Sequence, residues 1–238
     1  MGKASFADKV KYLIVKIYIL LPLILIGFGV YFFYYGFFIR NKINKTYDDI
    51  SNINYAIKSK MNKFKGFDNS IVIGSGFLPV DFKLFMDSKK MQGNMIPNRF
   101  GGRIFFYEAF NTMEERELFL ANFSNQEKYK EVYQGTSSYL ILFTQLSRHE
   151  CQQLAIQDWK RKNINFVGLE ASYMTPAASH NGISNLKYRF LVDEPANDTT
   201  NFTIHDEGII SKTPMTKDVS SQACKCFKSN CTIALKFN

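Results

Sequence analysis

Four cysteines are the residues of this sequence best suited to chemistry, and three of them lie close together near its C-terminal end. Cys224, Cys226 and Cys231 fall within eight residues, whereas Cys151 lies more than seventy residues upstream. Cysteines in such a pattern serve as metal ligands, as a redox pair or as structural disulfides. The choice among these three roles also decides the compartment in which the protein works.

Structural disulfides are the role that the spacing favours. A structural zinc site takes four nitrogen or sulfur ligands, often from CxxC pairs, whereas this sequence reads CxC-x4-C with no histidine nearby. We therefore predict no metal and no cofactor. Four cysteines allow three pairings, and the spacing alone does not choose among them. Because disulfides persist outside the reducing cytosol, the C-terminal part is expected to be periplasmic or extracellular.

The surroundings of Cys151 predict the start of a helix. In "SRHECQQLAIQDW", Glu150 follows Ser147 by three residues, which is the spacing of a capping box. Cys151 and Leu154 then share one helical face with Trp159, so the thiol is expected to point into the core. A buried thiol suits a staple better than a reactive site.

Motifs of the common enzyme classes do not occur in the sequence. We find no GxSxG, HExxH, GxGxxG or Walker-type spacing. We therefore predict a protein that is not an enzyme and has no small-molecule substrate.

Nucleic-acid binding is also disfavoured, because the net charge of +9 is confined to the N-terminal part. Residues 1–65 hold eleven Lys and Arg and only three acidic residues, so the remainder is nearly neutral. A nucleic-acid-binding domain carries its basic patch on its folded part.

An uncharged run of 23 residues, Ile17–Ile39, predicts a single membrane-spanning helix. A cleaved signal peptide is the competing interpretation. Its apolar region is shorter, about 7–15 residues, and ends in small residues, unlike Phe37-Phe38-Ile39-Arg40. Pro22 and the glycines Gly27 and Gly29 are expected bends within the helix.

Beyond Arg40 the apolar residues change to helical spacing. They recur every three or four residues, which predicts an amphipathic helix with a narrow apolar stripe that continues to Lys65 and stops at Gly66. The stripe consists of Ile43, Tyr47, Ile50, Ile53, Ile57, Met61 and Phe64. The predicted organisation is a cytoplasmic N-terminus at 1–16, a membrane helix at 17–39, its amphipathic continuation at 40–65 and a globular head at 66–238.

The predicted head is α+β. Residues 66–100 are rich in Gly, Asn, Pro and Asp and are expected to form loops, and residues 112–132 are a helix-permissive insertion. Strands are expected at five places with β-branched and aromatic residues. These are Arg103–Ala109, Ser138–Gln145, Asn165–Glu170, Leu186–Val192 and Thr232–Phe237.

The order of these features resembles type IVb pilins. The resemblance rests on the apolar helix with its amphipathic half, on "GSGFLPVDF", on "MIPNRFGGRIFF" with Phe100 in the place of a Trp, on "YLILFTQLSRHECQQLAIQDW" and on "QACKCFKSNCTIALKF". It implies a long membrane helix packed on an antiparallel sheet. It further implies a Cys151–Cys224 disulfide that closes the surface region, which leaves Cys226 and Cys231 to form a local clip.

The resemblance implies a structural subunit, or minor pilin, of a pilus, conjugation or secretion apparatus. Its expected partners are a bacterial inner membrane and other pilin-like or secretion-machine subunits, in a homo- or hetero-oligomer, or a surface pilus after processing. The sequence departs from the pattern in its early glycine, since only Gly2 followed by Lys3 is present, in the longer segments 112–132 and 171–185, and in its lack of an acid in the apolar run. Pilins carry a Glu in the apolar run that helps to dock the next subunit, whereas Ile17–Ile39 holds no acid and Asp8 is the only early one. This favours an uncleaved, membrane-anchored accessory protein as the alternative.

Overall fold

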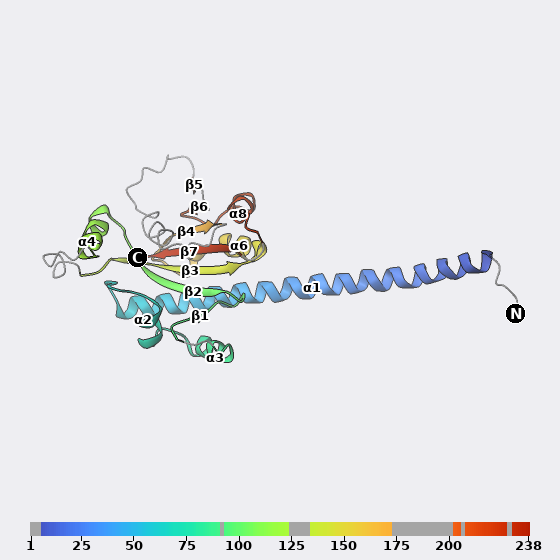
Figure 1. The fold of residues 1–238 in the computed structure, drawn as a ribbon, viewed down its shortest axis with the longest axis horizontal. Coiled ribbons are helices and arrows are strands. Elements are labelled where there is room, and N and C mark those ends of the chain that lie inside the picture. Colours follow the sequence, from blue (N-terminus) through green and yellow to red (C-terminus); the bar gives the residue numbers. More distant parts are fainter. Residues whose placement is uncertain (1–5, 91–92, 124–133, 173–201, 206–207, 228–229) are drawn as a thin grey trace. The chain divides into compact units, whose positions relative to one another are not determined.

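The computed structural model describes residues 6–90, 93–123, 134–172, 202–205, 208–227 and 230–238. The chain is α+β, with a long apolar helix near the N-terminus and an antiparallel sheet (Figure 1). It divides into two compact units, Met1–Lys42 and Ile43–Asn238. The second unit therefore begins within the amphipathic segment, whereas the sequence placed the start of the head at residue 66.

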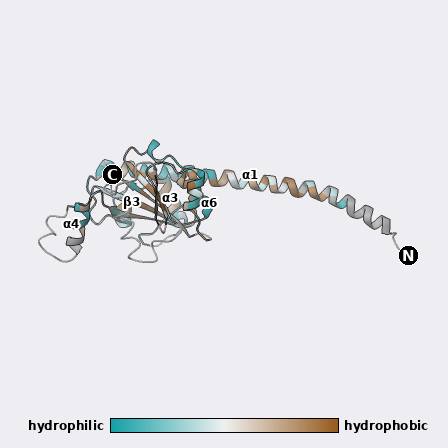
Figure 2. Ribbon diagram, turned by 90° about the horizontal axis from the view of Figure 1, so that it is seen from above, coloured by the Kyte–Doolittle hydropathy of each residue, from teal (hydrophilic) through white to brown (hydrophobic). Residues whose placement is uncertain are grey.

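The first unit contains the apolar part of helix α1, which spans Phe6–Lys60. The helix continues through Pro22 and is long and apolar enough between Leu20 and Lys60 to cross a membrane. Its aromatic side chains are exposed, with Phe33 at 79% and Tyr34 at 68%. Figure 2 shows the apolar colouring along this part of α1. Length and composition alone support a span here.

The helix ends at Lys60, five residues before the predicted end. Beyond it the chain turns toward the sheet, because Phe64 forms an antiparallel bridge with Thr136 (N–O distances of 2.9 and 3.0 Å). Gly66 has a φ of +63°, and its amide donates to Oε1 of Glu108 at 2.6 Å. The last stripe residues, Met61 and Phe64, therefore lie beyond the end of α1. The pairing of Phe64 with the distant Thr136 ends the helix before its periodic pattern ends.

Within the described residues, the second unit is built on a seven-stranded antiparallel sheet of order β1-β2-β3-β7-β4-β6-β5. The last strand in sequence, β7, therefore lies at the centre, between β3 and β4. The strands are β1 (Ile96–Pro97), β2 (Arg103–Ala109), β3 (Ser138–Leu146), β4 (Phe166–Ser172), β5 (Phe202–His205), β6 (Gly208–Ser211) and β7 (Cys231–Phe237). Four of the five predicted strands are present, and the fifth, Leu186–Val192, lies outside the described residues.

Short helices connect the strands. They are α2 (Asn69–Gly74), α3 (Val80–Ser88), α4 (Met113–Phe123), α6 (Arg148–Ala155), the 3-10 turn η1 (Trp159–Arg161) and α8 (Lys217–Ala223). The prediction of loops throughout 66–100 was therefore wrong. Asp68 caps α2 by accepting from the amides of Ser70 (2.8 Å) and Ile71 (3.1 Å), and Pro79 precedes α3.

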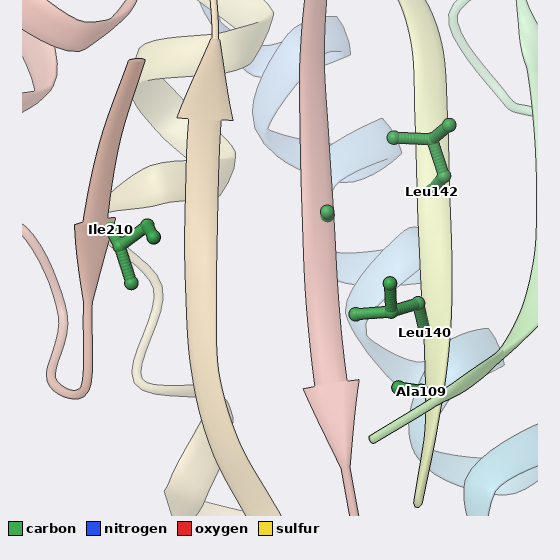
Figure 3. Packing of buried hydrophobic residues seen from close by; sticks show 5 residues of the cluster. Ala109, Leu140, Leu142 and Ile210 are labelled. Carbon is green, nitrogen blue, oxygen red and sulfur yellow. The ribbon is translucent and has the colours of Figure 1, made fainter. Parts of the chain in front are cut away.

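Both faces of β3, the neighbour of the central strand β7, are buried. Tyr139 packs on Phe64 and Phe67, which follow α1, while Leu140 and Leu142 point to the opposite face. Figure 3 shows Leu140 and Leu142 with Ala109 and Ile210 on one face of the sheet, with α1 behind the other. Burial on both faces explains why the sequence of β3 is a continuous apolar run instead of an alternating one.

Candidate functional site

The first candidate site is the helix seam, defined here as the surface where residues Ile43–Lys60 of α1 pack on the rest of the second unit. Burying one Ile or Phe side chain contributes roughly 1.5–3 kcal/mol to the free energy of unfolding. The packing at the seam therefore accounts for a large part of the stability of this unit. Among the predicted stripe residues, Tyr47 and Met61 are partly buried and five are at most 3% exposed. Those five are Ile43, Ile50, Ile53, Ile57 and Phe64.

An aromatic cluster closes the C-terminal end of the seam. The rings of Phe64, Phe67 and Tyr139 have centroids 4.8–5.4 Å apart, at tilted or edge-on angles. Phe237 of β7 stacks on Tyr139 at 5.5 Å. Edge-on and offset contacts of this kind add to the stabilisation from burial, so the central strands are joined to the chain that leaves α1.

A buried polar network lies in the middle of the seam, centred on Asn54 of α1. Its Nδ2 donates to Oδ1 of Asn163 (2.9 Å) and of Asn165 (2.8 Å). Its Oδ1 accepts from Nδ2 of Asn165 (3.0 Å) and from the hydroxyl of Tyr139. Burial raises the pKa of Tyr139 well above its usual range, so the phenol keeps its proton and acts as the donor. Because a shifted helix would leave these groups unpaired, the network fixes the register of α1 on the sheet.

Two further contacts join the N-terminal half of the seam to other elements. Asp49 accepts from Nε of Arg99 at 2.6 Å, and the guanidinium lies 4.9 Å from the ring centroid of Phe85 in α3. The ring of Tyr47 packs on that of Trp159 at 5.1 Å. The Asp49–Arg99 pair is mostly buried, so Arg99 has both an ionic and an aromatic partner. These contacts tie α3 and η1 to the helix.

The second candidate site is the cysteine cluster where α6, α8 and β7 meet. The sulfurs of Cys151 and Cys224 are bonded to each other, and so are those of Cys226 and Cys231. These are the two pairs that the resemblance implies. Cys151 follows the predicted capping box, in which the hydroxyl of Ser147 accepts from the backbone amide of Glu150 and the carboxylate of Glu150 accepts from the backbone amide of Ser147.

A buried lysine lies at the end of β7. The side chain of Lys236 is 0% exposed, and its Nζ donates to the carbonyl of Phe110 at 2.7 Å. Burial lowers its pKa to about 8, and the nearby carboxylate of Glu115 acts in the opposite direction. Glu115 itself accepts from the amides of Asn111 (2.7 Å) and Ser137 (2.9 Å), which joins α4 to the ends of β2 and β3.

The predicted membrane-helix residues belong to the first unit and form a separate group. A Cβ added to Gly27 or Gly29 would meet nothing within 4 Å, so neither glycine is required by a close contact within the described residues. The other predicted membrane-helix residues also belong to α1. Ile17 and Pro22 lie inside the helix, and Ile39 lies at the end of the apolar run.

Sequence reasoning missed the polar members of the seam and the buried lysine. The one available signal was the position of Asn54, which lies between Ile50 and Ile57 on the stripe, where a polar residue needs a buried partner. No comparable signal marks Lys236, because it occupies an apolar strand and its partner, Phe110, is 126 residues away in the chain.

Comparisons with known proteins do not assign the chain to a family. No protein-family model matches the sequence. None of the curated proteins compared with it matches at a significant level.

Proposed function

We propose that this protein is a non-enzymatic, pilin-like structural subunit of a pilus, conjugation or secretion apparatus, anchored in a bacterial inner membrane. The observation that carries the proposal is the helix seam. An amphipathic continuation of an apolar helix buries Ile50, Ile53 and Ile57 against an antiparallel sheet. This is the arrangement that the resemblance to type IVb pilins implies, and it acts by packing instead of by chemistry.

The cysteine cluster supports the same proposal. A Cys151–Cys224 bond joins the helix after β3 to the segment before the last strand, as in the pilins that the sequence resembles. In an oxidising compartment this bond would persist and keep α6 joined to the C-terminal end of α8. The N-terminus would then be cytoplasmic and the second unit periplasmic, or exposed on a surface fibre if the chain is processed.

One observation favours a second candidate, an accessory protein that stays in the inner membrane and does not enter a fibre. The apolar run Ile17–Ile39 contains no acidic residue. A buried carboxylate in an apolar helix is expensive and is retained where it pairs with a neighbouring group. Without one, the helix has no charged contact inside the bilayer that would guide the addition of a subunit.

A photo-crosslinking experiment in the native host distinguishes the two candidates. A photoreactive phenylalanine analogue is placed at Phe33, which is 79% exposed on α1, and in a control at Phe106, which is 1% exposed in β2. Cells are sheared, and the fibre and membrane fractions are probed separately. A fibre subunit gives a ladder of self-crosslinks from Phe33 in the sheared fraction. An accessory protein gives one or a few hetero-crosslinks, in the membrane fraction alone.

The control defines the background, because a buried position reaches no neighbouring subunit in a folded head. Alkaline carbonate extraction provides the independent check on anchoring. Release of the full chain from the membrane by carbonate would rule out both candidates, since a helix that spans the bilayer resists it.

A further inference from the structure

Three cysteine sulfurs form a tight group under the surface of the second unit. The Sγ atoms of Cys151, Cys224 and Cys231 all lie within 4.8 Å of one another, and each of these residues is 0% exposed. Three elements bring them together. Cys151 lies on α6, Cys224 caps the C-terminal end of α8, and Cys231 opens β7 opposite Leu146 of β3. Each of these sulfurs is bonded, to one another or to Cys226, so the group is two neighbouring disulfides instead of a set of free metal ligands.

Cys226 differs from the other three in its access to solvent. It is partly exposed, between the exposed residues Lys225 and Phe227, and its sulfur is not a member of the tight group. Its Sγ lies 4.0 Å from the carbonyl oxygen of Leu146 at the end of β3. Access governs the rate at which a thiolate attacks a disulfide. A reagent in solution therefore meets Cys226 before it meets any other sulfur of the cluster.

We propose that the Cys226–Cys231 bond is the entry point for attack by a dithiol, and that Cys231 then relays the exchange to the buried Cys151–Cys224 bond. In the first step a thiolate of the dithiol bonds to Sγ of Cys226. The bond between Cys226 and Cys231 breaks, and Cys231 leaves with the electron pair as a thiolate. This thiolate is buried beside the sulfurs of Cys151 and Cys224.

In the second step the Cys231 thiolate attacks one sulfur of the neighbouring bond. A new disulfide forms between Cys231 and either Cys224 or Cys151, and the other member of the old pair leaves as a thiolate. The second thiol of the dithiol then displaces Cys226 and closes its own disulfide. The dithiol is oxidised, two protein thiols are gained, and no further oxidant or reductant is needed. After the exchange, Cys231 cross-links β7 to α8 or to α6, in place of the original cross-link between α6 and α8.

Two single variants test the relay, because each leaves one unpaired cysteine. Cys226→Ser leaves Cys231 unpaired inside the tight group, whereas Cys231→Ser leaves Cys226 unpaired outside it. The purified full-length chains are quenched in acid, alkylated, digested without reduction, and mapped by mass spectrometry. We expect C226S to contain Cys151–Cys231 or Cys224–Cys231 links beside the Cys151–Cys224 link. We expect C231S to contain Cys151–Cys224 alone.

The same distribution of links in both variants would overturn the proposal. A time course on the wild-type chain keeps it testable if a variant fails to fold. With dithiothreitol, the reagent should form its mixed disulfide with Cys226 and not with Cys151 or Cys224, and trapped intermediates should contain a Cys231 cross-link to one of these two buried cysteines. The double variant C226S/C231S should open the Cys151–Cys224 bond at least about tenfold more slowly than the wild type, since it lacks the relay. An equal rate, or earlier opening of the Cys151–Cys224 bond, would contradict the relay.

Discussion

The hydroxyl of Tyr139, in strand β3, donates a hydrogen bond to the side-chain oxygen of Asn54, which lies 85 residues earlier on α1. Both residues are buried, and Asn54 uses all its remaining capacity on Asn163 and Asn165. A stripe of aliphatic side chains can slide along a sheet with modest loss, but a closed set of buried hydrogen bonds cannot. The Tyr139–Asn54 pair therefore specifies the register of α1 on the sheet, while the apolar stripe supplies most of the free energy of packing α1 on the sheet.

Replacing Asn54 with Leu should lower the free energy of unfolding by about 2–4 kcal/mol. The substitution leaves the Tyr139 hydroxyl and two Asn side chains without their partner, which exceeds the gain from a larger apolar residue. Trp159, the only tryptophan of the chain, is fully buried, so its fluorescence reports unfolding of the second unit in the detergent-solubilised protein. Asn52→Leu is the matched control, because Asn52 is exposed on the same helix and should change stability by less than about 0.5 kcal/mol.

A close approach of two backbone segments predicts a second sensitive position, Gly135. It has a φ of +99°, and a Cβ there would lie 2.7 Å from the carbonyl carbon of Phe64. Gly135→Ala should therefore displace the Phe64–Thr136 bridge and destabilise the protein by about 2–4 kcal/mol. Gly76→Ala is the control, with a φ of +70° but nothing within 4 Å, and should cost about 1 kcal/mol. Equal losses would show that strain in φ alone, and not the contact, sets the requirement for glycine.

Elements with strong local signals were predicted from the sequence to within a residue or two. The bounds of β2, Arg103–Ala109, match the prediction at both ends, and the capping box at Ser147 starts α6 as expected. Periodicity likewise identified the buried stripe. In these cases the residues that decide the structure are neighbours in the chain, so their pattern carries the information.

Elements decided by distant contacts were not predicted. The end of α1 depends on pairing between Phe64 and Thr136, which are 72 residues apart in the chain. The four-residue strand β6 is too short to show alternation, and α2 and α3 lie in a segment whose Gly and Pro content indicated loops. At the site, apolar members follow a period, whereas Asn54 is paired with Asn163, 109 residues away. Nothing in the local sequence identifies such a partner.

The buried Lys236 predicts a pH dependence of stability at alkaline pH. Its pKa in the folded chain is about 8, against 10.5 for the unfolded chain, so the folded state binds fewer protons between these values. Stability should therefore rise from about pH 8 to pH 10.5, by up to roughly 2–3 kcal/mol, and the penalty is fully present below pH 8. Glu115 opposes the effect, and Tyr107, whose pKa burial raises to about 12, titrates above this window.

The variant Lys236→Met isolates this contribution. It removes the buried charge while keeping a long side chain, so the difference in stability between variant and wild type should shrink as the pH rises toward 10.5. Lys225→Met, at an exposed position, is the control and should show a difference that does not change across the window. A wild-type minus K236M difference that stays constant from pH 7.5 to about 10.5 would mean that Lys236 has the same pKa in the folded and the unfolded chain, so that burial does not penalise its charge.

The two disulfides should differ in their effect on stability, because they close loops of very different length. The Cys151–Cys224 bond spans a sequence separation of 73 and the Cys226–Cys231 bond a separation of 5. Loop-closure entropy gives about 4 kcal/mol for the first and about 2 kcal/mol for the second. The double variants C151S/C224S and C226S/C231S remove the same number of sulfurs, so each controls for the other. The urea-unfolding midpoint, followed by Trp159 fluorescence, should therefore decrease more in C151S/C224S than in C226S/C231S. A larger loss in C226S/C231S would mean that the local clip holds structure beyond its own loop, since chain entropy cannot account for that order.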